Sequence, residues 1–180
     1  MKNVKIKSNK WFVVFGLSIA IVIGLTFVVS SQAAAGSSGC SCPYTKTTQY
    51  GGSGGNAFSD DLTMSVKITK ISIRHGTYVD AIQTTWQRTS GEEYTGTRHG
   101  GGGGTETIIN LKSDEYINRI EGRSGRYIDQ LTFYTNKGNK FGPYGGSGGS
   151  EFSMTDLCVG GFFGSSGTYL DAIGVFTSFK

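Results

Sequence analysis

Three short segments of this 180-residue chain share one pattern: a glycine, a tyrosine two positions later and an aspartate two positions after that. They are "GTYVD" (76–80), "GRYID" (125–129) and "GTYLD" (167–171), and each has a branched aliphatic residue before its aspartate. In a strand, residues two apart project from the same face, so each tyrosine and aspartate share a side while the aliphatic residue turns to the core. The pattern predicts a carboxylate acceptor and an aromatic ring side by side, three times over.

Three glycine clusters alternate with these segments: "GGSGG" (51–55), "GGGGG" (100–104) and "GGSGG" (145–149). Such loops expose backbone N–H donors with no side chains in the way. An ionised carboxylate accepts strong hydrogen bonds from two hydroxyl groups at once. Donors, carboxylate and ring together predict a shallow pocket for a neutral ligand rich in adjacent hydroxyls, such as a pyranose sugar.

The same segments have a plainer interpretation as hairpin corners, in which the aspartate bonds to turn amides and the tyrosine packs. A repeated turn does not need a separate glycine cluster for each copy, and this favours binding.

The elements that must position these residues are strands. In "KITKISIR", Ile68, Ile71 and Ile73 mix with polar residues at nearly period two, which is typical of a half-buried antiparallel strand. No helical apolar pattern follows residue 35. The clusters start at 51, 100 and 145 and the segments at 76, 125 and 167. A period in the forties predicts an all-β fold of three four-stranded antiparallel sheets with pseudo-threefold symmetry, since a propeller needs more blades than this length supplies.

Residues 1–35 differ from the rest of the chain. Four lysines in the first ten residues, an uncharged apolar run at 11–29 and small residues ending at Ala35 are typical of a secretory signal. The apolar run is also long enough for an uncleaved membrane anchor. We therefore expect a secreted domain or, alternatively, a membrane-anchored one outside the cytoplasm, with membrane contact only through 11–29.

The net charge and the cysteines limit which ligands and partners can be expected. Without the four leader lysines the formal charge of +4 falls to about zero, which excludes the basic footprint of a nucleic-acid binder. Either Cys40 or Cys42 could pair with Cys158, and lipid modification of Cys40 is a further alternative. No Cys-x-x-Cys occurs, and His75 and His99 stand in unrelated contexts, so we expect no metal and no cofactor.

Catalysis is not expected. Glycoside hydrolysis generally needs two carboxyl groups flanking the bond, whereas each segment supplies one. Glu92 and Glu93 are adjacent and would point to opposite faces of a strand. The remaining alternative is a structural or adhesive module without sugar binding.

Residues 44–180 resemble a jacalin-related lectin domain, the β-prism I fold. "TTQYGGSGGNAFSD" resembles the family's opening strand and glycine loop, and "FFGSSGTYLDAIGVF" its closing hairpin with the Gly-x-x-x-Asp sugar motif. Three motifs with three clusters resemble the griffithsin-like, three-site mannose lectins. Residues 36–43 are then a short linker.

The resemblance implies binding of mannose- or glucose-containing glycans or glycoproteins, because the uncut glycine loop is similar to that of mannose/glucose-type members. It implies that Asp171 works with Gly55, Asp80 with Gly104, and Asp129 with Gly149, and it leaves a homodimer open. The implied site residues are Gly55, Gly76, Tyr78, Val79, Asp80, Gly104, Gly125, Tyr127, Ile128, Asp129, Gly149, Gly167, Tyr169, Leu170 and Asp171.

Two departures from the family pattern stand out. The middle cluster is all glycine, so a more flexible loop and a weaker site are expected there. Arg126 replaces the threonine of the other two copies, which is expected to alter the preference of the second site.

Overall fold

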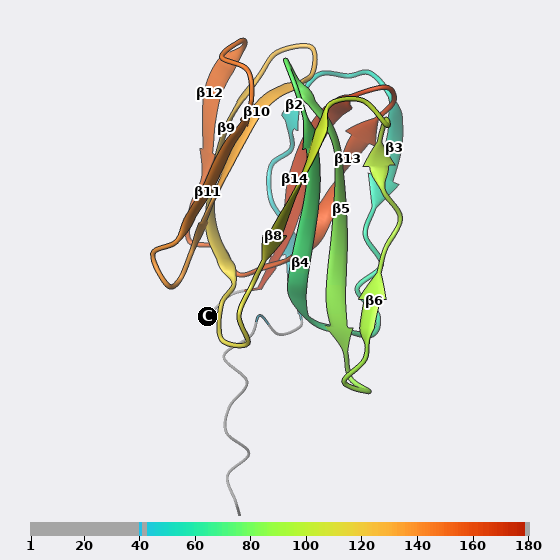
Figure 1. The fold of residues 1–180 in the computed structure, drawn as a ribbon, viewed down its shortest axis with the longest axis vertical. Helices are drawn as coiled ribbons and strands as arrows, with labels where there is room; N and C mark the ends of the chain where they lie inside the picture. The colour runs from blue at the N-terminus through green and yellow to red at the C-terminus, as the bar shows by residue number, and fades with distance from the viewer. Residues whose placement is uncertain (1–39, 41–42, 179–180) are drawn as a thin grey trace, which may run out of the picture. The chain divides into compact units, whose positions relative to one another are not determined.

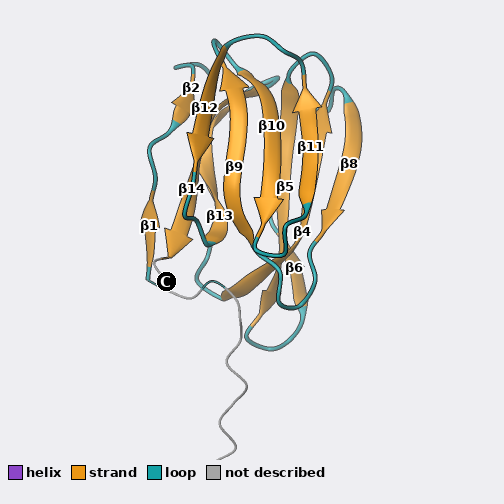
Figure 2. Cartoon of the chain, turned by 90° about the vertical axis from the view of Figure 1, so that its left-hand side faces the viewer, coloured by secondary structure: helices purple, strands orange, loops and turns teal. Residues whose placement is uncertain are grey.

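The computed structural model describes Cys40 and residues 43–178, and strands joined by turns make up this part (Figure 1). No helix occurs among these residues (Figure 2). The strands form three antiparallel sheets, each built on a path of four neighbouring strands. The all-β prediction and the three four-stranded sheets are confirmed.

Sheets B and C are each built from one continuous stretch of the chain, whereas sheet A combines strands from the start and the end of the described residues. Sheet A has the order β1-β14-β13-β3, sheet B the order β6-β5-β4-β8, and sheet C the order β11-β10-β9-β12. The strands of sheet A are β1 (Tyr44–Lys46), β2 (Tyr50–Gly51), β3 (Asn56–Ser59), β13 (Val159–Ser166) and β14 (Leu170–Ser178). Those of sheet B are β4 (Ser65–His75), β5 (Val79–Arg88), β6 (Glu93–Thr95), β7 (His99–Gly100) and β8 (Thr105–Asn110). Those of sheet C are β9 (Ile117–Ser124), β10 (Ile128–Thr135), β11 (Lys140–Gly145) and β12 (Ser150–Met154).

One edge of each sheet ends on the first glycine of a cluster. In sheet A, β1 and β2 are two pieces of one edge, since both pair with β14. In sheet B, β6 and β7 likewise both pair with β5. In sheet C the corresponding edge is a single strand, β11, which pairs with β10 with one register shift. The edges end at Gly51, Gly100 and Gly145, so the three clusters leave their sheets at equivalent points.

The three sheets bury one shared apolar core. On β4, Ile68, Ile71 and Ile73 are all buried, although the first two are three residues apart. A register shift between Ile68 and Lys70 inserts the extra residue, and this bulge explains why the sequence alternates only nearly at period two. Trp86 on β5 donates from Nε1 to the carbonyl oxygen of Gly160 at 2.7 Å, which ties sheet B to sheet A. Each fully buried aliphatic or aromatic side chain contributes roughly 1.5–3 kcal/mol, so the core holds the three hairpins rigidly together.

A disulfide closes one end of sheet A. It joins Cys40 to Cys158 across a sequence separation of 118 residues, beside Tyr44 and Tyr116. Cys158 lies just before β13, whereas the segment 167–171 follows that strand, so the disulfide and the segment lie at opposite ends. Of the two possible partners of Cys158 the structure selects Cys40, a residue of the segment predicted as a linker; Cys42 lies outside the described residues.

Glu115 is buried at the corresponding end of sheet C. Its Oε1 accepts hydrogen bonds from Thr135 Oγ1 at 2.7 Å and Asn139 Nδ2 at 2.6 Å, and its Oε2 accepts one from the Lys112 N–H at 3.2 Å. Burial by itself raises the pKa of Glu115, but these bonds outweigh it and hold that pKa below its usual value. The ionised carboxylate thus ties the β10–β11 turn to the chain entering β9.

The predicted leader, residues 1–35, lies outside the described part of the chain. Within the described part, no helix is long and apolar enough to cross a membrane.

Candidate functional site

The three predicted aspartates occupy the same position in the three sheets. Asp80, Asp129 and Asp171 are each the second residue of the strand that follows a hairpin turn, in β5, β10 and β14 respectively. The aliphatic residues before them, Val79, Ile128 and Leu170, are fully buried, as expected from their alternation. Each turn is closed by the N–H of its glycine donating to the carbonyl of its tyrosine, for Gly76, Gly125 and Gly167, at 2.9, 3.0 and 2.9 Å. The core therefore anchors each carboxylate from the residue beside it.

Each aspartate meets one glycine cluster, in the pairing that the resemblance implied. A Cβ on Gly54 or Gly55 would lie 2.4 or 2.5 Å from a carboxylate oxygen of Asp171. The same holds for Gly103 and Gly104 at Asp80, and for Gly148 and Gly149 at Asp129, at 2.4–2.5 Å. Only glycine lets the backbone come so close to the carboxylates. The glycines are thus a steric requirement of the loop's approach to the acid.

The clusters share one backbone course. Their second residues, Gly52, Gly101 and Gly146, donate their N–H to the main-chain carbonyl of the paired aspartate at 2.9–3.0 Å. Their last residues, Gly55, Gly104 and Gly149, all have a left-handed φ, of 72°, 61° and 65°. The all-glycine middle loop, expected to be more flexible, therefore has the same course as the two loops that contain serine.

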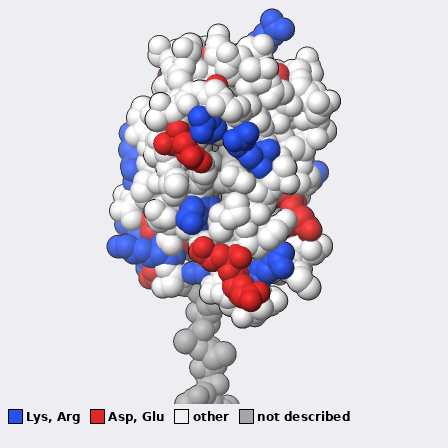
Figure 3. All heavy atoms as spheres, turned by 45° about the vertical axis from the view of Figure 1, so that its right-hand side comes forward, with Lys and Arg blue, Asp and Glu red and all other residues white. Residues whose placement is uncertain are grey.

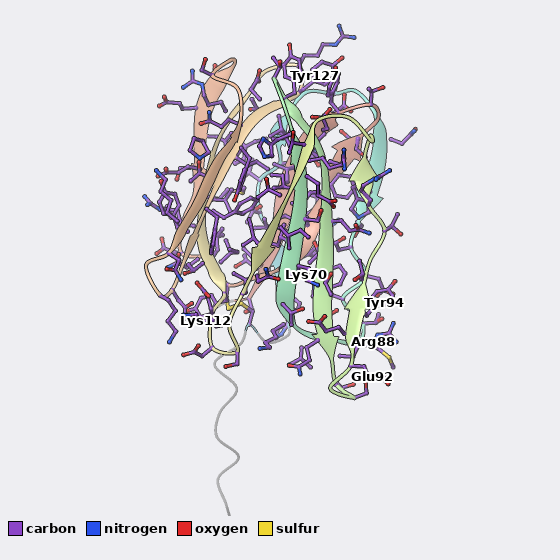
Figure 4. The ribbon with its side chains drawn as sticks, in the orientation of Figure 1. Lys70, Arg88, Glu92, Tyr94, Lys112 and Tyr127 are labelled. Atoms are coloured by element: carbon purple, nitrogen blue, oxygen red, sulfur yellow. A yellow bond between two sulfur atoms is a disulfide. The ribbon has the colours of Figure 1, made fainter. Side chains whose placement is uncertain are left out.

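The tyrosines meet one another at the centre of this end. The rings of Tyr78, Tyr127 and Tyr169 lie 4.9–5.2 Å apart, centroid to centroid, in three tilted or edge-to-face pairs. Figure 4 shows Tyr127 at the upper end of the domain, far from Lys112, Arg88 and Glu92. Each tyrosine therefore contributes to a shared aromatic centre that joins the three aspartate–loop units.

Each loop also touches the next copy of the motif. A Cβ added to Gly52 would lie 2.1 Å from the carbonyl oxygen of Arg126. A Cβ added to Gly101 would lie 2.3 Å from the carbonyl oxygen of Thr168. The N–H of Gly146 donates to the carbonyl of Thr77 at 3.1 Å. The three units thus form a closed ring in which each loop spans two sheets.

Because each loop touches the next copy of the motif, Arg126 contacts a loop that serves a different aspartate from its own. The residue belongs to the second copy, yet its backbone lies against the first glycine cluster, which serves Asp171. Its guanidinium lies 5.5 Å from the Tyr127 ring. Burial raises the pKa of the Asp171 carboxyl, and both a hydrogen bond from the Gly167 backbone and the charge of Arg126 act against that rise. Arg126 therefore lies between the Asp129 and Asp171 units, whereas the sequence assigned it to the second alone.

The three aspartates are buried, and one carboxylate oxygen among them has no hydrogen-bond partner. The exposed fractions of Asp80, Asp129 and Asp171 are 6, 6 and 5%. Asp129 Oδ2 is buried with no hydrogen-bond partner among the described residues. A buried oxygen without a partner is costly, so this carboxylate keeps unused acceptor capacity beside its glycine loop. The upper end of the surface in Figure 3 is mostly uncharged; one cationic group projects from it, and small patches of acidic atoms show among the uncharged ones. A largely uncharged surface suits a neutral ligand.

Sequence reasoning missed two sets of polar residues. Arg74 and Arg123 donate to the carbonyls of two of the loops, and the signal was an arginine two residues before the motif glycine in two copies. Asp60 has a nearly buried side chain that bonds to His99 Nε2 at 2.9 Å, Thr84 Oγ1 at 3.2 Å and the Phe162 N–H at 2.9 Å. This second set joins sheets A and B, and nothing in the local sequence announced it.

A groove of about 560 Å³ lies elsewhere, over the outer face of sheet C, which faces the viewer in Figure 2. Its walls are largely paired with each other: Tyr134 donates to Glu121, and Arg123 pairs with Glu151 at 2.6 Å. It contains none of the predicted site residues. Within the described part of the chain, no group of three or more His, Cys, Asp or Glu side chains is placed to hold a metal ion.

The fold and the repeated loop–aspartate units define a three-sheet β-prism. The model of the jacalin-like lectin domain matches residues 47–176. Griffithsin from Griffithsia sp. is 39% identical over 128 residues, which cover 71% of this chain and 93% of that protein. This chain belongs to the jacalin-like lectin family.

Solved structures agree with this assignment. Malaysian banana lectin is 34% identical, with a TM-score of 0.68 over 77% of this chain and 100% of its own. Artocarpin in complex with mannotriose is 28% identical, with a TM-score of 0.69 over 77% of this chain and 99% of its own. The predicted family is confirmed.

Proposed function

We propose that the domain binds mannose-type glycans at three sites, one at each aspartate–loop unit. The observation that carries the proposal is the repeated approach of two glycines to a buried aspartate, which brings loop backbone free of side chains beside a carboxylate three times. Family membership and the mannotriose complex of artocarpin support the choice of sugar.

The chemistry of each unit matches one pyranose. The carboxylate accepts from two adjacent hydroxyls, and the N–H groups of the motif and of the last cluster glycine donate to sugar oxygens. Each bond replaces one to water, so the net gain is only about 0.5–1.5 kcal/mol per bond and a single site binds weakly.

The arrangement of the units favours branched glycans. The three tyrosine rings lie within 5.2 Å of their neighbours, so the units share one end of the domain. Sites on one surface can engage several branches at once, which raises avidity without new contacts at any site.

Calorimetry with monosaccharides tests this function. Mannose, and secondarily glucose, should bind with up to three equivalents per domain, galactose should bind more weakly, and EDTA should have no effect. Asp114→Ala, a matched removal of an exposed carboxylate outside the three units, should bind as the unmodified protein does. Galactose preference, or loss of binding in EDTA with recovery in calcium, would contradict the proposal.

The protein is further proposed to leave the cytoplasm, as a secreted domain or one anchored through residues 11–29. The Cys40–Cys158 disulfide supports this, because disulfides persist mainly in oxidising compartments. Intact-mass measurement of the native protein should give a start near Gly36 if the leader is cleaved. A full-length species that requires detergent would support the anchor.

A further inference from the structure

Two of the three glycine loops are held by an arginine. Arg74 donates from Nε to the carbonyl of Gly103 at 2.7 Å and from Nη2 to that of Gly104 at 2.8 Å. Arg123 donates in the same way to Gly148 and Gly149, both at 2.8 Å. Each arginine lies two residues before its motif glycine. The loops paired with Asp80 and Asp129 thus have the same two-point brace.

A glutamate stands opposite each of these arginines. Glu106 on β8 is the register partner of Arg74, and their side chains approach to 4.0 Å. Glu151 on β12 is the register partner of Arg123, and their side chains form an ion pair at 2.6 Å. Both arginine side chains are mostly buried, with exposed fractions of 21 and 27%. The glutamate keeps each guanidinium beside its loop.

The loop paired with Asp171 lacks both partners. Ser165 occupies the arginine position, and Ala57, its register partner on β3, occupies the glutamate position. Among the hydrogen bonds of the described residues, no side chain donates to the carbonyl of Gly54 or Gly55. Arginine and glutamate are thus present together in two copies and absent together in the third.

The brace acts on the donor that a sugar needs. In a trans peptide the C=O of one residue and the N–H of the next point in opposite directions. Holding the carbonyl of Gly103 toward Arg74 therefore turns the N–H of Gly104 away from that arginine, and Arg123 does the same for Gly149. The Gly54–Gly55 peptide has no such restraint, and glycine rotates freely enough for the loop to pay an ordering entropy on binding.

We propose that Arg74 and Arg123 are positioning residues that preorganise the loops of the Asp80 and Asp129 sites, and that the unbraced Asp171 site binds a single mannose most weakly. This inference rests on the proposed lectin function. It places the weak site at Asp171, whereas composition alone suggested the all-glycine loop.

Three one-site variants test the inference, each keeping one aspartate and carrying Ala at the other two. Methyl mannoside should bind the Asp171-only variant about 10-fold more weakly than either of the others, or about 1.4 kcal/mol. Adding Arg74→Gln to the Asp80-only variant should remove that advantage and speed amide exchange at Gly104. The same Arg74→Gln in the Asp129-only variant is the matched control and should leave affinity unchanged. Ser165→Arg with Ala57→Glu should strengthen the Asp171-only variant.

The outcomes separate the inference from the function beneath it. If Arg74→Gln weakens both variants equally, or lowers the denaturation midpoint in step with affinity, its role is structural and the inference is wrong. Equal affinity at all three sites, with binding intact, would also overturn the inference and leave the lectin function standing. If no folded one-site variant binds any sugar, the proposed function itself fails.

Discussion

The two ends of the domain differ in how far they repeat from sheet to sheet. At the loop end the same unit occurs three times, with an aspartate, a glycine loop and a tyrosine turn in each sheet. At the other end each sheet closes in its own way. Sheet A has the Cys40–Cys158 disulfide, sheet C has buried Glu115, and sheet B places the Arg88 guanidinium 4.2 Å from the Tyr94 ring (Figure 4). Under the proposed function the loop end must keep one geometry for its ligand. The closing end needs only to be stable, and different contacts can achieve that in each sheet.

Removing the disulfide should show the largest difference between the two ends, with a large loss of stability and little change in mannose affinity. Cys158→Ser opens a loop of more than one hundred residues, and the unfolding free energy should fall by about 2–5 kcal/mol. Mannose affinity of the folded variant should stay within about twofold, because the disulfide lies at the end opposite the loops. Denaturant unfolding and calorimetry measure the two quantities. A parallel loss of affinity would show that the ends are coupled.

Replacing Glu115 should have a smaller effect on the closing end. Glu115→Gln weakens charge-assisted hydrogen bonds worth roughly 1.5–3 kcal/mol each, so we expect a loss of about 1–3 kcal/mol at neutral pH. The folded pKa of Glu115 is lowered, so its stabilisation is present above about pH 4.5 and is lost as the pH falls through the folded pKa. The variant should lack this acid-dependent component. Glu92→Gln, at an exposed position, is the control and should retain it.

The smallest effect concerns the pH dependence of one site. Burial raises the pKa of Asp171, and a sugar needs the ionised carboxylate as acceptor. Affinity of the Asp171-only variant should therefore be constant above that raised pKa and fall as the pH drops through it. Arg126→Thr removes a charge that lowers the pKa, so the fall should begin at a higher pH. Titrations of methyl mannoside across acidic pH measure this, and a flat profile in both proteins would contradict it.

The sequence predicts the repeated end better than the closing end, and the reason is physical. The pattern around Asp80, Asp129 and Asp171 is local and occurs three times, so spacing located the segments and the loops. Which loop meets which aspartate did not follow from spacing and was implied only by the resemblance to the family. The partner of Cys158 could not be predicted from the sequence, because Cys40 and Cys42 lie only two residues apart and either could reach it. The Asp60 network joins residues from several strands, and such contacts leave no local pattern.

The arginine brace lies between these cases. Arg74 and Arg123 recur at one position relative to their motifs, so the sequence contained the signal. Its meaning depended on the carbonyls of Gly103 and Gly148 turning toward the guanidinium, and only the folded loop shows that. The position of Arg126 between two units was likewise hidden, since it follows from the ring in which each loop touches the next sheet.

The central claim is that the three aspartates bind sugar and are more than turn residues. Its most direct measurement is mannose binding by the triple variant Asp80→Ala, Asp129→Ala, Asp171→Ala, together with its circular dichroism and denaturant unfolding. We expect a folded β protein, because the core and the closing end are untouched, with no detectable binding of mannose. A folded triple variant that still binds mannose would contradict the account.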